Sequence, residues 1–325
     1  MSTRRQFLAG AGALLSAACS AGLVSAHDTG TAAPFTTTRL NNGVDMPMIG
    51  FGTYRTFDET ANAVDTALRS GYRLVDTAAY YKNEVQVGEG IARSEVPRRH
   101  LFIASKLWMA DYGYDSALRA FDESVRRLRL EYLDAYFLHY PAPRHFDTTL
   151  AAYRAMERLL REGRIRAIGV SNFGSGDLQR LRQETNVVPA INQVEVHPYF
   201  NQLPLREENR RLGILTQAWS PLGGIYINHP KDPSGVIHLL RDPQLVAIAT
   251  KYARSPAQIV LRWHVQNGVA VIPKSIHAAR IRENFEIFDF RLAQEDMAAI
   301  NGLNRDLRGG TDPAIFDMDL IRSRG

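Results

Sequence analysis

Four side chains that could act together on a carbonyl group stand at or just after the ends of apolar, strand-like segments. They are Asp76, Tyr81, Lys106 and His139, a carboxylate, a phenol, an amine and an imidazole. Hydride transfer to a carbonyl carbon leaves an alkoxide, which needs a proton and local positive potential. This set could supply both, so its residue types favour carbonyl reduction.

Each of the four residues has a distinct part in that chemistry. A phenol is a weak acid at neutral pH, with a pKa of about 10. A neighbouring ammonium such as Lys106 favours the phenolate and eases proton release from Tyr81. Asp76 would hold the ammonium, and His139 would orient the carbonyl oxygen. Taken singly, each also has an ordinary structural explanation: a helix cap, a solvated lysine or a core histidine. Their convergence therefore carries the hypothesis.

The elements that must bring these residues together alternate along the chain. Strand-like segments are expected at 49–52, 73–75, 102–104, 135–138, 167–170, 190–194, 215–218 and 269–272. Helical periodicity is expected at 58–70, 84–94, 115–129, 147–162, 175–184, 204–211, 242–253, 256–267 and 278–285. A hairpin is expected at 38–46, around Asn41-Asn42-Gly43. We therefore predict an α/β fold, a (β/α)8 TIM barrel with an N-terminal β-hairpin. Catalytic residues would lie at the carboxyl ends of its strands. An open doubly wound sheet is the alternative, but no G-x-G-x-x-G follows a strand.

Composition excludes several other classes of protein. The 325 residues are 45% hydrophobic and 22% charged, an ordinary globular balance. The net charge of +5 is small, and no basic run carries interleaved aromatics, so nucleic acid is not an expected partner. The one cysteine, Cys19, precedes the predicted barrel. The barrel therefore has no disulfide, thiolate nucleophile or cysteine metal site, and we expect no metal.

Residues 1–26 have the pattern of an export leader. A basic head with Arg4 and Arg5 precedes a short apolar stretch and the cleavage-like Val24-Ser25-Ala26. The head resembles a twin-arginine signal, which predicts a periplasmic protein. The apolar stretch is too short to span a membrane. The alternatives are a disordered tail, an inefficient leader that leaves the protein in the cytoplasm, or lipid anchoring at Cys19. A poor lipobox disfavours the last. Residues 27–37 are interpreted as a linker and 38–325 as the barrel domain.

Seven blocks of sequence carry a resemblance to a known family. They are GFGTY at 50–54, GYRLVDTAAYYKNE at 71–84, SKLW at 105–108, LHYP at 138–141, GVSNF at 169–173, NQVE at 192–195 and IPKS at 272–275. In order and spacing the chain resembles the aldo-keto reductases across residues 38–318. It is most similar to bacterial enzymes of the diketogluconate and methylglyoxal reductase type.

The resemblance implies functional residues at positions that match the family motifs. The catalytic tetrad would be Asp76, Tyr81, Lys106 and His139. The substrate would also contact Tyr54 and Trp108. The cofactor contacts implied are Thr53, Tyr54, Asp76, Ser171, Asn172, Gln193, Trp219, Ser220, Leu222, Gly223, Lys274, Ser275, Arg280, Glu283 and Asn284.

Two of these positions bear on the choice of cofactor. The cations Lys274 and Arg280, with the Ser275 hydroxyl, suit a 2′-phosphate, so we expect NADPH and NADP+ rather than NADH. A solvated basic helix start is the ordinary alternative. The segment 224–240 is longer than in short bacterial members. The short tail after Arg308 predicts an open substrate pocket.

The resemblance implies a monomeric, NADPH-dependent reductase of small aldehydes, ketoaldehydes or keto sugars. Two alternatives remain. One is a cofactor-binding sensor or auxiliary protein on the same barrel, with little turnover. The other is a barrel hydrolase or aldolase that uses Lys106 as a Schiff-base amine. The carboxylate of Asp76 beside that amine disfavours the second.

Overall fold

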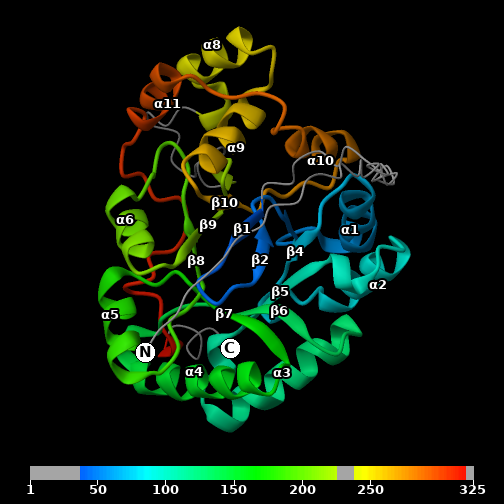
Figure 1. Cartoon of the computed structure of the whole chain (residues 1–325), viewed down its shortest axis with the longest axis vertical. Coiled ribbons are helices and arrows are strands. Elements are labelled where there is room, and N and C mark those ends of the chain that lie inside the picture. The colour runs from blue at the N-terminus through cyan, green and yellow to red at the C-terminus, as the bar shows by residue number, and fades with distance from the viewer. Residues whose placement is uncertain (1–36, 225–237, 320–325) are drawn as a thin grey trace, which may run out of the picture. The chain divides into compact units, whose positions relative to one another are not determined.

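Eight parallel strands form the centre of the protein. The computed structural model describes residues 37–224 and 238–319. Neighbouring strands pair in the order β10-β9-β8-β7-β6-β5-β4-β3 (Figure 1). Their bounds are β3 Phe51–Gly52, β4 Leu74–Asp76, β5 Phe102–Leu107, β6 Leu133–Leu138, β7 Ile165–Ser171, β8 Ile191–Glu195, β9 Leu215–Trp219 and β10 Ala270–Val271. Every residue of β5, β6 and β8 is buried, as expected for a parallel sheet covered on both faces.

The sheet closes where its first and last strands meet. A parallel bridge joins Ile49 to Val271. The Gly50 amide donates to the Val271 carbonyl at 2.8 Å, and the Gly52 amide donates to the Pro273 carbonyl at 3.0 Å. These bonds continue the ladder across the seam, so the strands form a (β/α)8 barrel, as the sequence predicts.

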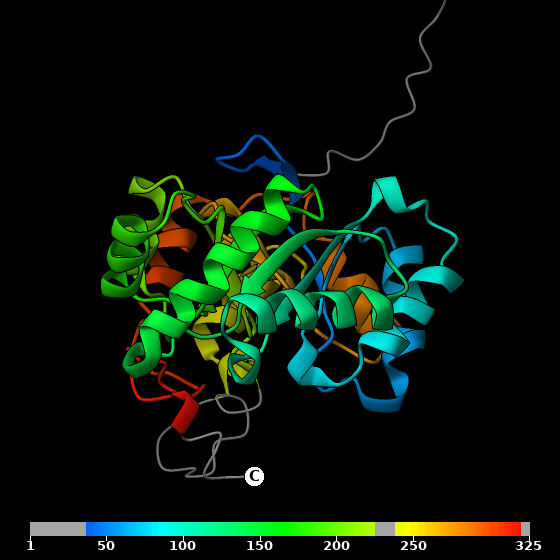
Figure 2. The ribbon, with the colours of Figure 1, turned by 90° about the horizontal axis from the view of Figure 1, so that it is seen from below.

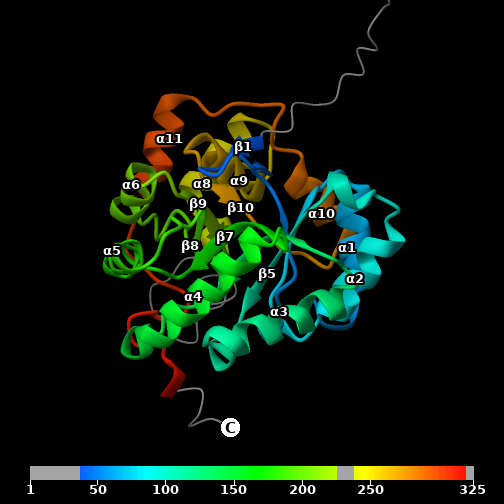
Figure 3. The same cartoon turned by 60° about the horizontal axis from the view of Figure 1, so that its bottom comes forward.

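Helices surround the barrel (Figures 1 and 3). The α-helices are α1 Thr60–Arg69, α2 Glu84–Arg93, α3 Tyr114–Leu128, α4 Phe146–Arg161, α5 Ser175–Glu184, α6 Leu203–Arg211, α8 Pro243–Lys251, α9 Pro256–Gln266, α10 Ala278–Phe285 and α11 Gln294–Asn301. The 3-10 turns are η1 Phe57–Glu59, η2 Ala79–Tyr81, η3 Arg98–His100, η4 Met109–Asp111, η5 Pro143–His145 and η6 Leu239–Arg241. Long members such as α3 bury one apolar stripe against the strands and expose a charged face.

The N-terminal hairpin covers the end of the barrel where the strands begin. It pairs β1 Thr37–Arg39 with β2 Asp45–Pro47 in antiparallel register. The Asn41 side chain donates to the Pro189 carbonyl and Asn42 donates to the Arg166 carbonyl, both near strand starts. Figure 2 shows the hairpin (blue) at the opposite end from the C-terminal segment (red). The expected hairpin is confirmed, and the strand ends stay clear for chemistry.

The expected strands, α-helices and hairpin are found, and the described residues contain one further α-helix as well as the 3-10 turns. Helix α11 was not anticipated, because its eight residues carry few apolar side chains at helical spacing. The helix expected at 256–267 is α9, and a capping box between the Ser255 hydroxyl and the Gln258 side chain marks its start. The leader, most of the linker and most of the 224–240 segment lie outside the described residues. Within the described part, none of the helices has the length and apolarity to cross a membrane.

The barrel seam makes a specific prediction about stability. A Cβ at Gly52 would lie 2.8 Å from the Ile272 carbonyl oxygen, so β3 and β10 would be forced apart. We expect Gly52→Ala to lower the free energy of unfolding by about 1–3 kcal/mol, as overpacking does. Urea denaturation measures this.

The matched control is Gly176→Ala in α5, where the added Cβ meets nothing within 4 Å. This change is expected to stabilise by about 0.5–1 kcal/mol, because alanine is the better helix residue. Equal unfolding free energies for the two variants would contradict the tight seam.

Candidate active site

The four predicted catalytic residues lie together at the carboxyl ends of β4, β5 and β6. Asp76 ends β4, Lys106 is the next-to-last residue of β5, and His139 directly follows β6. Tyr81 ends the 3-10 turn η2, which returns from β4 toward the barrel mouth. Strand register and one short turn thus bring together residues far apart in the sequence.

The Lys106 ammonium lies at the centre of this group. Its side chain is fully buried, and Nζ donates to Asp76 Oδ1 at 2.5 Å. It also donates to the Thr77 carbonyl oxygen at 2.9 Å and lies 3.4 Å from the Tyr81 hydroxyl. A buried ammonium needs such partners, because isolated charge is costly in the interior. The result is a continuous chain from carboxylate through ammonium to phenol.

Burial dominates the electrostatics of the group. It raises the pKa of Tyr81 well above 10, and the Asp76 carboxylate raises it further. Burial also lowers the pKa of Lys106, an effect that Asp76 opposes. The sequence led us to expect that the Lys106 charge would ease release of the phenol proton. In the structure burial and the Asp76 charge have the larger effect, so Tyr81 holds its proton firmly.

The His139 ring faces the other aromatic side chains of the group. Its centroid lies 5.8 Å from that of Tyr81 and 5.2 Å from that of Trp108. Burial lowers its pKa well below 6.5, and the Lys106 charge lowers it further. Nδ1 is buried and has no hydrogen-bond partner among the described residues. An N–H there would lack an acceptor, so the proton of the neutral ring belongs on Nε2.

Aromatic side chains line the mouth around the tetrad. Tyr54 packs on Tyr81 with centroids 4.9 Å apart, and Tyr80 stacks on Trp108 at 4.1 Å. A hollow of about 510 Å³ opens beside Tyr54, Tyr80 and Tyr81. The sequence predicts Tyr54 and Trp108 as substrate contacts, and both lie at this mouth. It missed Tyr80, although Tyr80 directly precedes Tyr81.

The C-terminal segment completes the wall of the mouth. Phe316 lies 4.6 Å from Tyr140 and 6.2 Å from Trp108, centroid to centroid. The sequence led us to expect an open substrate pocket because the tail after Arg308 is short. In the structure this tail nevertheless reaches the site, since it places Phe316 against Tyr140 and Trp108. No local signal near Phe316 identifies this contact, because it depends on how the tail crosses the barrel.

A buried carboxylate holds that tail in place. Glu195, at the end of β8, accepts the Gly309 amide at 2.7 Å and the Gly310 amide at 2.9 Å. A Cβ at Gly310 would lie 2.3 Å from the Trp219 ring, so only glycine fits there. Glu195 also lies 3.0 Å from His197 Nε2. The sequence singled out this glutamate only as part of a motif.

The predicted nicotinamide contacts form one hydrogen-bonded cluster on β7, β8 and β9. Asn172 Nδ2 donates to Ser171 Oγ at 3.2 Å and to the His139 carbonyl at 3.0 Å. Trp219 Nε1 donates to Asn172 Oδ1 at 2.9 Å. Gln193 Nε2 donates to Asp76 Oδ2 at 2.8 Å, which joins the cluster to the tetrad.

The remaining predicted cofactor residues lie near the barrel seam. Thr53 is fully buried and donates to the Asp76 carbonyl. Ser220, Leu222 and Gly223 form the turn after β9, where the Gly223 amide donates to the Ser220 carbonyl. The Ser220 hydroxyl and the backbone amides of this turn are groups of the kind that bind phosphate oxygens.

The predicted phosphate-binding residues lie after β10 and on α10. Lys274 and Arg280 are exposed, and Ser275 accepts the His277 amide. Partial desolvation of the Lys274 ammonium by its neighbours lowers its pKa, although the residue as a whole is exposed, and the positive charge of Arg55 lowers the pKa further. Because Lys274 and Arg55 repel each other, an anion bound near both would be favoured. The sequence did not name Arg55, which follows Tyr54 directly.

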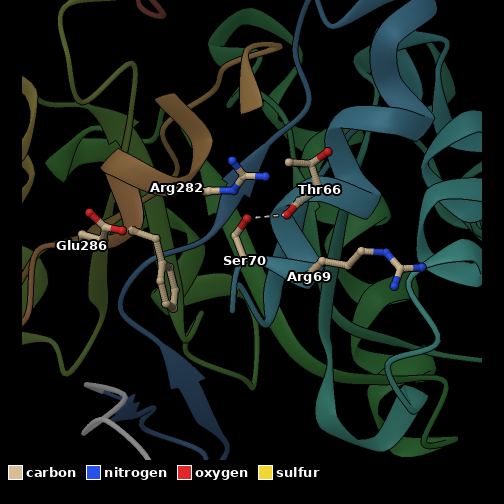
Figure 4. A pocket seen from close by; sticks show the side chains of 6 residues that line it. Thr66, Arg69, Ser70, Arg282 and Glu286 are labelled. Atoms are coloured by element: carbon tan, nitrogen blue, oxygen red, sulfur yellow. Dashed lines mark hydrogen bonds between the residues drawn. The ribbon is translucent and has the colours of Figure 1, made fainter. Parts of the chain in front are cut away.

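Helix α10 has a second face that belongs to a different feature. Glu283 and the buried Asn284 are the predicted adenine contacts. Arg282 instead lines a separate shallow hollow between α1 and α10, with Thr66 and Ser70 opposite (Figure 4). Arg280 and Arg282 therefore offer two cations on one helix, only one of which belongs to the predicted phosphate site.

Comparisons with known proteins agree with this geometry. Residues 48–305 match the model described as the aldo/keto reductase family. The chain is 49% identical to a morphine 6-dehydrogenase of Pseudomonas putida over 280 residues, 86% of this chain and 94% of the relative. It is 46% identical to a glyoxal reductase of Bacillus subtilis over 279 residues, 85% of this chain and 96% of the relative. A Bombyx mori aldo-keto reductase solved in complex with NADP superposes with a TM-score of 0.80 at 36% identity, covering 86% and 97% of the two chains.

Two buried histidines predict a loss of stability in acid. The pKa of His139 is held well below 6.5, and burial lowers that of His264 to about 3. Below about pH 6.5 these two histidines bind protons in the unfolded chain, whereas in the folded protein their rings stay neutral. Unfolding free energy therefore falls as pH drops from about 6.5 toward the folded pKa values.

The measurement is NMR of the imidazole rings together with denaturation at several pH values. Both rings are expected to stay neutral between about pH 5 and pH 8. In His264→Phe, the acid-dependent loss of stability is expected to be smaller. A His139 ring that titrates near pH 6.5 would contradict the burial argument.

Proposed function

The chain belongs to the aldo/keto reductase family, and we propose that it is an NADPH-dependent reductase in which Tyr81 is the general acid. The observation that carries the proposal is the hydrogen-bonded chain from the buried Asp76 and Lys106 to the partly exposed Tyr81, with His139 beside the phenol. The proposed reaction takes small aldehydes or ketones to alcohols.

Tyr81 is suited to hold a proton until the carbonyl accepts a hydride. Burial and the Asp76 carboxylate raise the pKa of Tyr81, which favours the protonated phenol. An alkoxide is a far stronger base than a phenolate, so the proton still transfers once the alkoxide forms. Lys106 then stabilises the phenolate as it appears, because its ammonium lies 3.4 Å from the oxygen.

His139 orients the carbonyl in this proposal. The ring is neutral, and the absence of an acceptor near Nδ1 among the described residues leaves Nε2 to donate. A neutral N–H donor positions a carbonyl oxygen without competing with Tyr81 for the role of acid. Asp76 acts through Lys106, by holding the ammonium in place.

NADPH would supply the hydride when bound. The donor set fits it: amide and hydroxyl groups of Ser171, Asn172 and Gln193 would hold the carboxamide, and Trp219 would stack on the ring. Thr53, Tyr54 and the turn at 220–223 would lie along the rest of the cofactor. Lys274, Ser275 and Arg280 would hold the 2′-phosphate, with Arg55 adding charge, and Glu283 and Asn284 would lie near the adenine.

The substrate side is aromatic rather than charged. The rings of Tyr54, Trp108 and Phe316 suit small or flat carbonyl compounds, among them ketoaldehydes and keto sugars. One relative is named a glyoxal reductase and another a morphine 6-dehydrogenase, and these names support a proposal that includes both small and polycyclic carbonyl compounds.

The alternatives are weaker on the same observations. A cofactor-binding sensor has no need for a buried Lys106 paired with Tyr81, which costs desolvation. A Schiff-base mechanism requires a free amine at Lys106, but Nζ is already hydrogen-bonded to Asp76 and the Thr77 carbonyl.

We further propose that the protein is a monomer and that the leader directs its export to the periplasm.

The variant Tyr81→Phe tests the proposed general acid. Loss of the general acid is expected to lower kcat by about 10²–10⁴-fold. Affinity for NADPH is expected to stay nearly unchanged, because the ring is kept. NADPH consumption with methylglyoxal and fluorescence titration of the cofactor measure the two effects. A variant as fast as the wild type would remove Tyr81 as the acid.

The variant Arg280→Ala tests the proposed contact with the 2′-phosphate of the cofactor. Loss of a charge-assisted bond to the 2′-phosphate is expected to weaken NADPH binding by about 10–100-fold, with little effect on NADH. Arg282→Ala, on the other face of α10, is the matched control and is expected to leave both affinities unchanged. Equal losses for NADPH and NADH in Arg280→Ala would show that the phosphate is bound elsewhere.

A further inference from the structure

Two buried glutamines on neighbouring strands extend the catalytic chain across the barrel. Gln193 on β8 and Gln217 on β9 are register partners, 1% and 2% exposed. Gln193 Nε2 donates to Gln217 Oε1 at 2.8 Å and to Asp76 Oδ2 at 2.8 Å. The other oxygen of Asp76 accepts from Lys106. Gln217 thus stands at the far end of a path that leads to Tyr81.

The direction of these bonds follows from counting donors. A carboxylate only accepts, so the amide nitrogen of Gln193 must face Asp76. That nitrogen carries two hydrogens, and the second goes to Gln217. Both hydrogens of Nε2 are then used. Since Oε1 of Gln193 has no hydrogen bond to the described residues, it is the atom of this side chain that can accept from a ligand. A carboxamide ligand can therefore meet Gln193 only through its own N–H.

Gln217 keeps the Gln193 side-chain amide from turning over, so that its nitrogen stays toward Asp76. Without an acceptor at Gln217, the second N–H of Gln193 has no partner within a buried pair of strands, which is costly. The amide gains by turning toward another partner, and Asp76 then loses a donor. Because hydrogen bonds in such a chain strengthen one another, the loss reaches the Lys106 end.

We propose that Gln217 is a positioning residue: it holds the Gln193 amide with its nitrogen toward Asp76 and its oxygen toward the nicotinamide carboxamide. The assignment rests on the proposed function for the identity of that ligand. It adds a residue that touches neither the reacting carbonyl nor the catalytic acid, and it makes cofactor orientation and the Asp76–Lys106 pair depend on one amide.

The test is a double-mutant cycle with Gln217→Met, Gln193→Met and the pair. Methionine fills similar volume without an acceptor. We expect Gln217→Met to weaken NADP+ binding about 10-fold and to lower kcat about as much, as loss of one buried bond predicts. KM for the carbonyl is expected to stay within about 2-fold. The double variant is expected to be no worse than Gln193→Met alone, because Gln217 acts through Gln193.

Additive losses in the cycle, or unchanged NADP+ affinity in Gln217→Met, would overturn the assignment. The control is Asn209→Leu, which removes a buried amide from the outer side of the same strands, where it bonds Thr216 and Asn192. This variant is expected to melt at a lower temperature while keeping the wild-type Kd for NADP+ and the wild-type ratio of kcat to KM.

A crystal structure of the wild-type NADP+ complex tests the same inference without a substitution. Gln193 Nε2 is expected to remain within hydrogen-bond distance of both Asp76 and Gln217. A Gln193 turned away from either would overturn it. A wild-type protein that binds NADP+ but reduces no carbonyl would contradict the proposed function instead, and the binding cycle and crystal structure would still decide the role of Gln217.

Discussion

The structure depends on one buried ammonium. Lys106 has no contact with solvent, and three oxygen atoms, one each from Asp76, Thr77 and Tyr81, lie within 3.4 Å of its Nζ. A charge so placed is tolerated only when its partners are fixed. Asp76 is fixed by ending a fully buried strand, and Tyr81 by a 3-10 turn that begins three residues later. The parallel barrel thus does more than present residues at its mouth, since its strand register sets the distances that keep the charge in the interior.

The same constraint spreads outward through hydrogen bonds. Asp76 contacts Gln193 across the barrel, and the neighbouring Asn172 links Ser171, Trp219 and the His139 carbonyl. Groups proposed to hold a cofactor are therefore joined to groups proposed to move a proton. Aromatic rings such as Tyr54 and Trp108 lie around this polar centre. The full burial of Lys106 strengthens the electrostatic effect of the ammonium on any charge that develops nearby.

The sequence predicts much of this arrangement because strand ends are marked by local pattern. Apolar runs followed directly by Asp76 or His139 reveal both the element and the position of the side chain. The order and spacing of seven motifs add the family. What local pattern could not supply were contacts between distant segments. Three such contacts arise from the packing of loops and are not encoded by any periodicity. They are the position of Phe316 at the mouth, the hydrogen bonds between Glu195 and the tail, and the proximity of Arg55 to Lys274. Helix α11 was missed for a related reason, since tertiary contacts and not its own apolar stripe hold it.

The hydrogen bonds from the Gly309 and Gly310 amides to Glu195 have a consequence for how the substrate side of the site can diversify. Glu195 lies at the end of the core strand β8, whereas the two glycines lie in the segment that follows α11. The same segment is fixed a second time where the buried Asp317 accepts the Arg144 amide at 2.8 Å. Phe316 lies between these two fixed points, so substitution at this one position can alter the substrate side while the barrel and its buried ammonium stay intact.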